Sequence, residues 1–188
     1  MENSQEKLAY EWVTVEAGNV DIASEFYCAT RDVFEARFGR MIRELFEKRE
    51  NDASIVSAVV GEIANNSFDH NLGNWRDVPG ILFSYFFSED KIEIVLADRG
   101  RGIFSTLKKV KPEIKNDQEA LMTAFTERIS GRAPEKRGNG LKFVRENVQS
   151  KKMHLSFYSG NAKAELNDEM KIEENLENIE GCLAIITL

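Results

Sequence analysis

The sequence predicts a protein of the α+β class, with helices and strands grouped in separate stretches of the chain. Residues 34–45 carry a helical apolar repeat. Residues 81–87 and 91–97 are two adjacent apolar segments of strand length, and residues 182–188 are a third. At 188 residues and 42% hydrophobic, the chain is long enough to bury one full core. We find no repeat, linker or change of composition, and therefore expect a single domain over residues 1–188.

The first 50 residues are expected to supply one strand and one helix. Polar and apolar residues alternate over residues 10–16 (YEWVTVE), which is typical of a strand at the edge of a sheet. Apolar residues then recur with helical spacing at Phe34, Phe38, Met41 and Leu45. Asn51 and Asp52 interrupt this repeat and can cap a second helix. The buried side of that second helix would hold Val56, Val60 and Ile63.

Further along the chain, the pattern predicts a loop, a hairpin, two helices and two closing strands. In chain order these are residues 71–79, 81–87 with 91–97, 116–129 and 141–149, and 153–158 with 182–188. Between the closing strands, residues 163–180 hold seven acids and two bases. We expect this acidic insert to be helical or disordered.

The overall charge argues against broad binding to nucleic acids, because a net charge of −7 repels a phosphate backbone. No apolar segment approaches the roughly 20 residues that a membrane span requires. The N-terminus lacks the basic start and apolar core of a signal peptide. Cys28 and Cys182 lie far apart and form no metal-type pair. We therefore expect a cytoplasmic protein without a membrane or nucleic-acid partner.

The first of three short motifs is GEIANNSFDHN at residues 61–71. Glu62 and Asn66 lie four residues apart, so a helix places both side chains on one face. A carboxylate there can orient or deprotonate a water molecule, and an amide oxygen suits Mg²⁺. The same spacing occurs on ordinary wet helix faces, but the neighbouring short polar residues have poor helix propensity, which folding alone would not favour. These neighbours are Asn65, Asp69, His70 and Asn71.

The second motif, ADRGRGI at residues 97–103, follows an apolar strand. Gly100 and Gly102 permit a positive φ or a close approach of the backbone to a ligand. The Asp98 carboxylate could accept a hydrogen bond from an exocyclic amine, which is how a closed pocket selects the edge of a base. Taken alone, the motif also fits a plain β-turn that contains an aspartate.

The third motif, RGNGLKF at residues 137–143, places glycines before a helix. The segment Gly138-Asn139-Gly140-Leu141 would expose backbone N–H groups at the positive end of the helix dipole, where a phosphate can bind. Residues 128–145 hold six basic residues and one acid, so Arg137 and its neighbours could neutralise phosphate charge. A solvated surface and a flexible helix entry are the alternative interpretations. No Walker-type phosphate loop occurs in the chain.

In this order, the three motifs resemble those of the GHKL ATPases, the family of gyrase, the large heat-shock chaperone, the histidine kinases and MutL. The similarity covers about residues 50–188. It implies a Bergerat-type fold, a two-layer α/β sandwich whose mixed, mostly antiparallel sheet is covered on one face by helices. It also implies that the protein binds ATP or ADP with Mg²⁺, and that residues 103–137 form the ATP lid.

The resemblance implies a role for each motif residue. Glu62 matches the activating glutamate, Asn66 the Mg²⁺-binding asparagine and Asp98 the acid that recognises the adenine amine. Gly100 and Gly102 match the glycines beside the adenine. The phosphate-binding part of the site is assigned to Arg137, Gly138, Asn139, Gly140 and Leu141.

The chain departs from the family pattern at several positions. Arg99 stands where histidine kinases often have asparagine, and Lys142-Phe143 replaces their usual second glycine repeat. Cys182 stands where many members have a threonine, so a hydroxyl contact to the base is not expected from this position. No pair of dimerisation helices with a phosphoacceptor histidine precedes the domain. The resemblance therefore implies a stand-alone ATP-binding domain and not a complete sensor histidine kinase.

Two alternative functions follow from the resemblance. In the first, the protein hydrolyses ATP slowly or transfers a phosphoryl group to a protein partner, as the anti-sigma switch kinases do, with Glu62 positioning the acceptor. In the second, ATP orders the lid and creates a surface for a protein partner, without significant turnover. The sequence leaves open the identity of the partner, the choice between an ATPase and a serine/threonine kinase, and whether the protein forms a homodimer.

Overall fold

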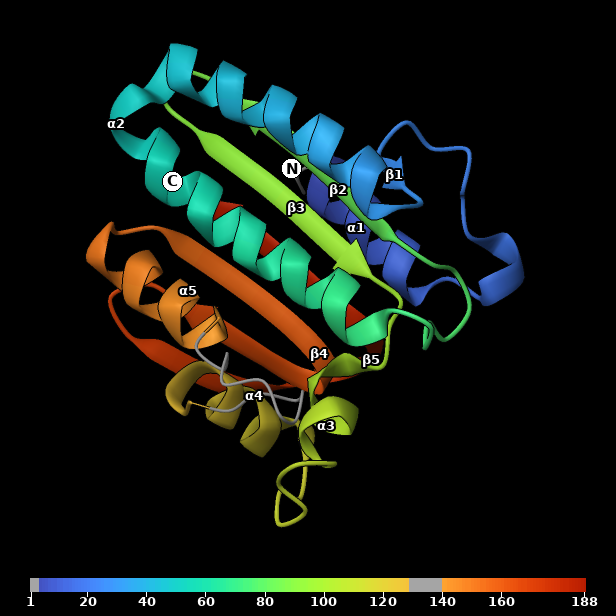
Figure 1. Ribbon diagram of the computed structural model, residues 1–188. Coiled ribbons are helices and arrows are strands. Elements are labelled where there is room, and N and C mark those ends of the chain that lie inside the picture. Colours follow the sequence, from blue (N-terminus) through green and yellow to red (C-terminus); the bar gives the residue numbers. More distant parts are fainter. Residues whose placement is uncertain (1–3, 129–139) are drawn as a thin grey trace.

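The computed structural model of the protein describes residues 4–128 and 140–188. Its strands are β1 (Tyr27–Cys28), β2 (Ile81–Phe87), β3 (Ile92–Asp98), β4 (His154–Leu166) and β5 (Met170–Thr187). Its helices are α1 (Ser4–Thr14), α2 (Arg31–Asn71), α3 (Gly102–Leu107), α4 (Asp117–Thr126) and α5 (Gly140–Ser150), with a short 3-10 helix at Ala17–Asn19. The strands form one sheet in the order β1-β2-β3-β5-β4, and the strand pairs of the described residues are antiparallel (Figure 1). The predicted α+β class and two-layer sandwich are confirmed.

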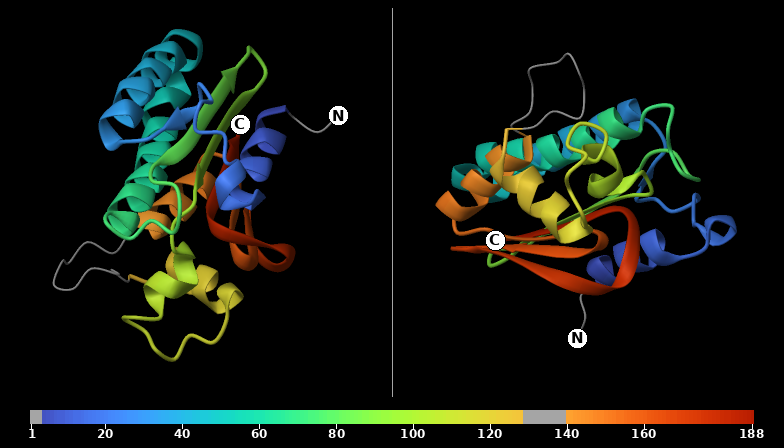
Figure 2. Two further views of the ribbon diagram at one scale, coloured as in Figure 1. Left: turned by 90° about the vertical axis from the view of Figure 1, so that its right-hand side faces the viewer. Right: turned by 90° about the horizontal axis from the view of Figure 1, so that it is seen from below.

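The main core lies between the sheet and the helices α2, α4 and α5 (Figure 2). Alternate residues of each strand face this layer, as in β3, where Ile94 and Leu96 are buried against it. The predicted hairpin is present, because Ile81 pairs with Asp98 at one end of β2 and Phe87 pairs with Ile92 at the other. Asp98, the acid of the second motif, is therefore the last residue of a fully buried strand.

The N-terminal prediction was wrong, because residues 10–14 belong to helix α1 and residues 15 and 16 follow it without forming a strand. Helix α1 packs on the face of the sheet opposite α2 (Figure 2), so the helical cover is not confined to one face as expected. Its buried residues Ala9, Trp12 and Val13 are spaced three and four apart, which is a helical repeat. They contact strand residues such as Val95 and Leu183, which point away from the main core. The alternation over residues 10–16 was coincidental, and the helical spacing beginning at Ala9 is the physical signal.

Helix α2 consists of two limbs that fold back on each other (Figure 1). The break lies at Arg49, whose φ of −144° and ψ of 56° are not helical, two residues before the predicted break at Asn51. The limbs meet again at their far ends, where Arg31 donates a hydrogen bond to Asn65 Oδ1 at 2.8 Å. The second limb carries Glu62 and Asn66 across the sheet toward the end of β3.

The acidic segment 163–180 is neither helical nor disordered but belongs to the long hairpin of β4 and β5. This hairpin bends back on itself, because Ser156 Oγ donates a hydrogen bond to Glu165 Oε2 at 2.9 Å although both residues belong to β4. Gly160, with a φ of +62°, lies at the irregular part of the strand between them. Apolar residues at every second position enter the main core and hold the bent hairpin in place. They are Ala162, Ala164 and Leu166.

The predicted lid, residues 103–137, is described as far as Arg128. That part contains α3 and α4, and Asn116 caps α4 by accepting a hydrogen bond from the Glu119 N–H at 2.8 Å. Residues 129–139 lie outside the described part of the chain, and with them Arg137, Gly138 and Asn139. Over the two described ranges, none of the helices combines the length and apolar character needed to cross a bilayer.

Candidate functional site

The first and third motifs meet where α5 begins. Gly140 is the first residue of α5, and a Cβ atom added to it would lie only 2.1 Å from Glu62 Oε1 and 3.2 Å from Asn66 Nδ2. The end of the Glu62 side chain therefore lies against the backbone of Gly140, and any larger residue at this position would displace the carboxylate. Leu141, the next residue, is buried in the main core and anchors the first turn of α5. Glu62, Asn66 and Gly140 thus form one cluster, as their assignment to one site requires.

Glu62 and Asn66 are partly exposed on the second limb of α2. Their neighbours on the buried side, Ile63 and Ala64, hold the helix against the core. Within the described ranges, no hydrogen bond or ion pair involves either the Glu62 carboxylate or the Asn66 amide. Both side chains are therefore free to interact with a ligand or metal ion. The described residues contain no group of three or more His, Cys, Asp or Glu side chains that could hold a metal ion by itself.

The Asp98 carboxylate faces α2 and is 1% exposed. It accepts hydrogen bonds from Ser67 Oγ at 2.7 Å, from the Gly100 N–H at 2.9 Å and from Asn71 Nδ2 at 3.2 Å. Burial raises the pKa of Asp98 above its ordinary value, although these three donors and the backbone N–H of Cys182 favour the ionised form. Asp98 therefore ties the loop that follows β3 to the second limb of α2.

Asn71 completes this attachment and was not assigned a role from the sequence. Its Oδ1 accepts a hydrogen bond from the Arg101 N–H at 3.0 Å, while its Nδ2 also donates to the Ser67 carbonyl at 2.9 Å. A Cβ atom on Gly100 would lie 2.0 Å from Asn71 Nδ2, so the glycine is required by the approach of this amide. Ser67 and Asn71 lie four residues apart, and that spacing was the available signal.

Gly102 begins α3 with a φ of +71°, a conformation that favours glycine. The next residue, Ile103, donates its N–H to Ser159 Oγ at 3.0 Å, and Ser159 donates to the Gly181 carbonyl at 2.8 Å. Ser159 Oγ also lies 3.7 Å from Cys182 Sγ. Burial and the Asp98 charge raise the pKa of the Cys182 thiol well above its ordinary value. A hydroxyl group therefore does lie beside Cys182, but β4 supplies it, from a residue that the sequence did not indicate.

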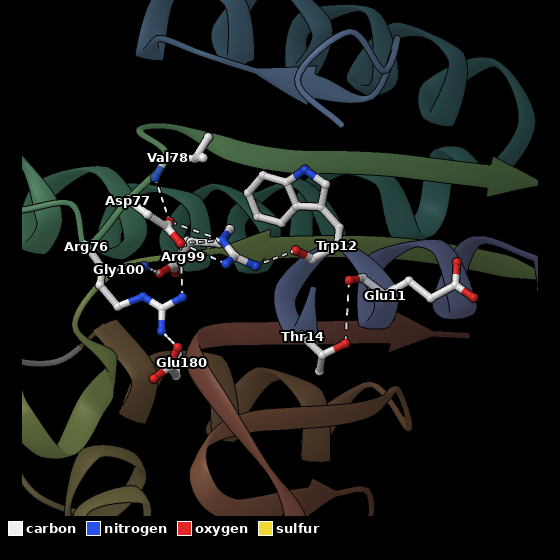
Figure 3. Close-up of polar contacts among 10 residues, drawn as sticks. Glu11, Trp12, Thr14, Arg76, Asp77, Val78, Arg99, Gly100 and Glu180 are labelled. Atoms are coloured by element: carbon white, nitrogen blue, oxygen red, sulfur yellow. Dashed lines mark hydrogen bonds and ion pairs between the residues drawn. The ribbon is translucent and has the colours of Figure 1, made fainter. Parts of the chain in front are cut away.

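Arg99 points to the opposite face of the sheet from Asp98, because Asp98 binds Ser67 of α2 whereas Arg99 binds Trp12 of α1. Figure 3 shows the contact of Arg99 with Trp12. Its Nε and Nη2 donate to the Asp77 carboxylate, the latter at 2.7 Å, and its Nη1 donates to the Trp12 carbonyl at 2.8 Å. Burial alone would raise the pKa of Asp77, but hydrogen bonds from Arg99, the Val78 N–H and Arg76 lower it to about 2. Arg99 therefore joins the loop after β3 to the loop after α2 and to α1.

A cavity of about 780 Å³ adjoins the loop Gly100-Arg101-Gly102. Its lining also includes residues 73–76 from the loop after α2 and residues 178–181 from β5. The lining does not include Glu62, Asn66 or Asp98. The structure thus brings Glu62, Asn66 and Gly140 together. Asp98 ends β3, Gly100 and Gly102 lie in the loop that follows, and the cavity beside that loop is not lined by Glu62, Asn66 or Gly140.

Comparison with known proteins adds little to this geometry. No protein-family model matches the chain, and no curated protein matches its sequence. Among solved structures, one that is similar is the mycobacterial sensor histidine kinase MprB, at 16% sequence identity and a TM-score of 0.43. The match covers 82% of this chain and 93% of that one. So distant a similarity carries no argument about function, which has to be argued from the site itself.

Proposed function

We propose that this protein binds Mg²⁺-ATP and either hydrolyses it slowly or transfers its terminal phosphoryl group to a protein partner. The observation that carries the proposal is the close approach of Gly140 to Glu62 and Asn66. This approach sets the positive end of the α5 dipole next to a carboxylate and an amide. A triphosphate, a metal ion and a reacting water or hydroxyl would need these three groups within one small region.

In this proposal, each side chain of the cluster has a separate task. Asn66 offers a neutral oxygen ligand to Mg²⁺, and the phosphates and water would complete the octahedral shell, as is usual for this ion. Glu62 orients or deprotonates the attacking water or hydroxyl. The glycine segment, assigned to Arg137, Gly138, Asn139, Gly140 and Leu141, would bind the phosphates. When bound, the metal ion would neutralise developing charge on the transferred group.

Recognition of adenine by Asp98 would require its carboxylate to exchange one of its present hydrogen-bond donors. A carboxylate has about four acceptor positions, and four donors already surround Asp98, from Ser67, Gly100, Asn71 and Cys182. An adenine amine would therefore replace one of these donors. Compared with the hydrogen bonds from Ser67 and Gly100, the one from Asn71 is the longest, at 3.2 Å, so Asn71 is the donor that we expect to leave.

This enclosure of Asp98 favours one alternative function, a nucleotide-gated module that binds a protein partner without significant turnover. If nucleotide entry displaces Asn71, it also releases the Arg101 N–H that Asn71 holds. Binding would then change the conformation of the loop, which is what a nucleotide-gated surface needs. A time course of ADP production, with and without candidate partner proteins, separates this alternative from an ATPase or a kinase.

Calorimetry of the full chain with Mg²⁺ tests the nucleotide assignment. ATP and ADP should bind and GTP should bind much more weakly, because Asp98 would face the carbonyl of guanine in place of an amine. Asp98→Asn should weaken ATP binding by about 2 kcal/mol, the scale of a hydrogen bond to a charged group. Asp168→Asn, in an exposed turn, is the matched control. Equal affinity for ATP and GTP would contradict the role of Asp98, and absence of ATP binding would contradict the proposed function.

A further inference from the structure

Two consecutive residues at the end of β3 attach the glycine loop to opposite layers of the protein. Asp98 is bound to α2 through Ser67 and Asn71. Arg99 extends to the other face of the sheet, where its guanidinium contacts Asp77 and Trp12. Figure 3 shows these contacts of Arg99, together with its neighbour Gly100. The position of the loop therefore depends on both layers, and one of them is the N-terminal helix.

The contact between Arg99 and α1 occurs at the end of that helix. Trp12 carries one of the last four carbonyl groups of α1 (Ser4–Thr14). The last four carbonyls of a helix have no hydrogen-bond donor within the helix itself. The last turn of α1 contains no basic residue of its own, so Arg99 supplies the cation that the negative end of the helix dipole favours. The guanidinium also lies over the Trp12 ring, 6.0 Å from its centroid. Arg99 thus caps the C-terminus of α1, as a hydrogen-bond donor and as a cation.

Arg99 is 1% exposed, so water cannot replace a lost partner without rearrangement. If α1 moved away, the guanidinium would lose the Trp12 carbonyl and part of its cover while remaining bound to Asp77. Water that reaches the guanidinium in place of α1 does not fix its position, so Asp77 alone would hold Arg99 on this face of the sheet. The arginine and the loop residues beside it, from Asp98 to Gly102, would then be able to shift. Docking of α1 and the present position of the loop consequently favour each other.

We propose that Arg99 is a positioning residue through which helix α1 stabilises the glycine loop of the nucleotide site, so that docking of α1 and binding of nucleotide are coupled. The coupling to nucleotide binding rests on the proposed function, whereas the coupling between α1 and the loop does not. Because such coupling is reciprocal, nucleotide should stabilise docked α1 by the same factor by which docked α1 strengthens nucleotide binding. Any partner protein that displaced α1 would thereby weaken nucleotide binding.

Hydrogen–deuterium exchange of the full chain tests the coupling, read separately over residues 4–14 and residues 99–103. Ala9→Glu places a charge at a fully buried position of α1 and should undock the helix. Lys7→Glu, on the exposed side of the same helix, is the matched control. Arg99→Met removes the guanidinium, and Arg99→Lys keeps the charge but loses the planar fork, so it replaces Arg99→Met if that variant does not fold.

Undocking by Ala9→Glu should speed exchange over residues 99–103 by at least about tenfold, the scale of one lost hydrogen bond to a charged group. Lys7→Glu should leave that exchange unchanged. In the Arg99→Met background, where the loop already exchanges fast, adding Ala9→Glu should have little further effect. If Ala9→Glu speeds exchange in α1 while residues 99–103 exchange as in the wild type, the helix and the loop are independent and the proposal is wrong.

A second arm adds Mg²⁺-ATP. Nucleotide should slow exchange over residues 4–14 in the wild type but not in Arg99→Met, and Ala9→Glu should weaken ATP binding by the factor that reciprocity requires. Unchanged ATP affinity in Ala9→Glu would overturn the coupling to nucleotide. If the wild type binds no ATP, the proposed function fails, whereas the exchange measurements without nucleotide still decide whether Arg99 couples α1 to the loop.

Discussion

Replacing Gly140 with alanine should separate catalysis from stability. The added Cβ would lie 2.1 Å from Glu62 Oε1, whereas ordinary contacts begin at 3.4 Å, so the carboxylate has to move by more than about 1 Å. Glu62 is partly exposed, and the end of its side chain can move at little energetic cost. Alanine also has the higher helix propensity, by up to about 1 kcal/mol. We therefore expect unchanged or slightly raised stability and about 100-fold slower turnover, the loss that a misplacement of about 1 Å can cause.

Two measurements on the same preparation check this prediction. Urea unfolding reports the free energy of unfolding, and a coupled assay of ADP release reports kcat. Gly18→Ala is the control, because no atom outside its immediate neighbours lies within 4 Å of the added Cβ. Wild-type kcat in Gly140→Ala would show that the position of the Glu62 carboxylate does not matter for turnover. A large loss of stability would show that the contact is a packing constraint and that Glu62 cannot yield.

Two further predictions concern single carboxylates and an amide. Glu62→Ala should abolish turnover and leave nucleotide binding largely intact, whereas Asn66→Ala should weaken binding of Mg²⁺-ATP; the opposite pattern in kcat and Kd would reverse the two assignments. The pKa of Asp77 falls from 3.8 to about 2 on folding, so its ionised form stabilises the protein above pH 3.8, and that stability is lost as the pH falls through about 2. Between pH 4 and pH 2 the free energy of unfolding of the wild type should therefore fall by about 2 kcal/mol through Asp77, as measured by urea unfolding. Asp77→Asn should lack this fall, and equal pH dependence in both proteins would contradict the assigned ion pair.

The parts of the fold that sequence could predict are those whose signal is local. Residues 81–87 and 91–97 are apolar over the length of a strand and separated by a short polar turn, and they form the expected hairpin. The helical repeat that includes Phe34 and Leu45 ends near its predicted break, because Arg49 leaves the helical conformation. The order of the motifs also predicted that Glu62 and Gly140 lie close together, although 78 positions separate them in the sequence.

The parts that sequence missed depend on contacts between distant segments. Residues 10–16 alternate like a strand, but the sheet offers Trp12 and Val13 an apolar face that a helix covers better. The many acids in residues 163–180 drew attention away from the apolar residues Ala162, Ala164 and Leu166, which alternate as in a strand. These three residues are buried in the main core. Ser159 could not be assigned to the site because only the pairing of β4 with β5 brings it to Cys182.

The same reasoning explains why the second motif, besides the adenine contact proposed for Asp98, also anchors the glycine loop to both sides of the sheet. A strand sends consecutive side chains to opposite faces, so an acid followed by a base is divided between the two layers. Asp98 is enclosed by donors from α2, and Arg99 by acceptors from the loop after α2 and from α1. The backbone of Gly100 follows directly after both anchors. A ligand that enters beside this loop therefore acts against two sets of buried hydrogen bonds, and the N-terminal helix, which lies outside all three motifs, contributes to the rigidity of the site.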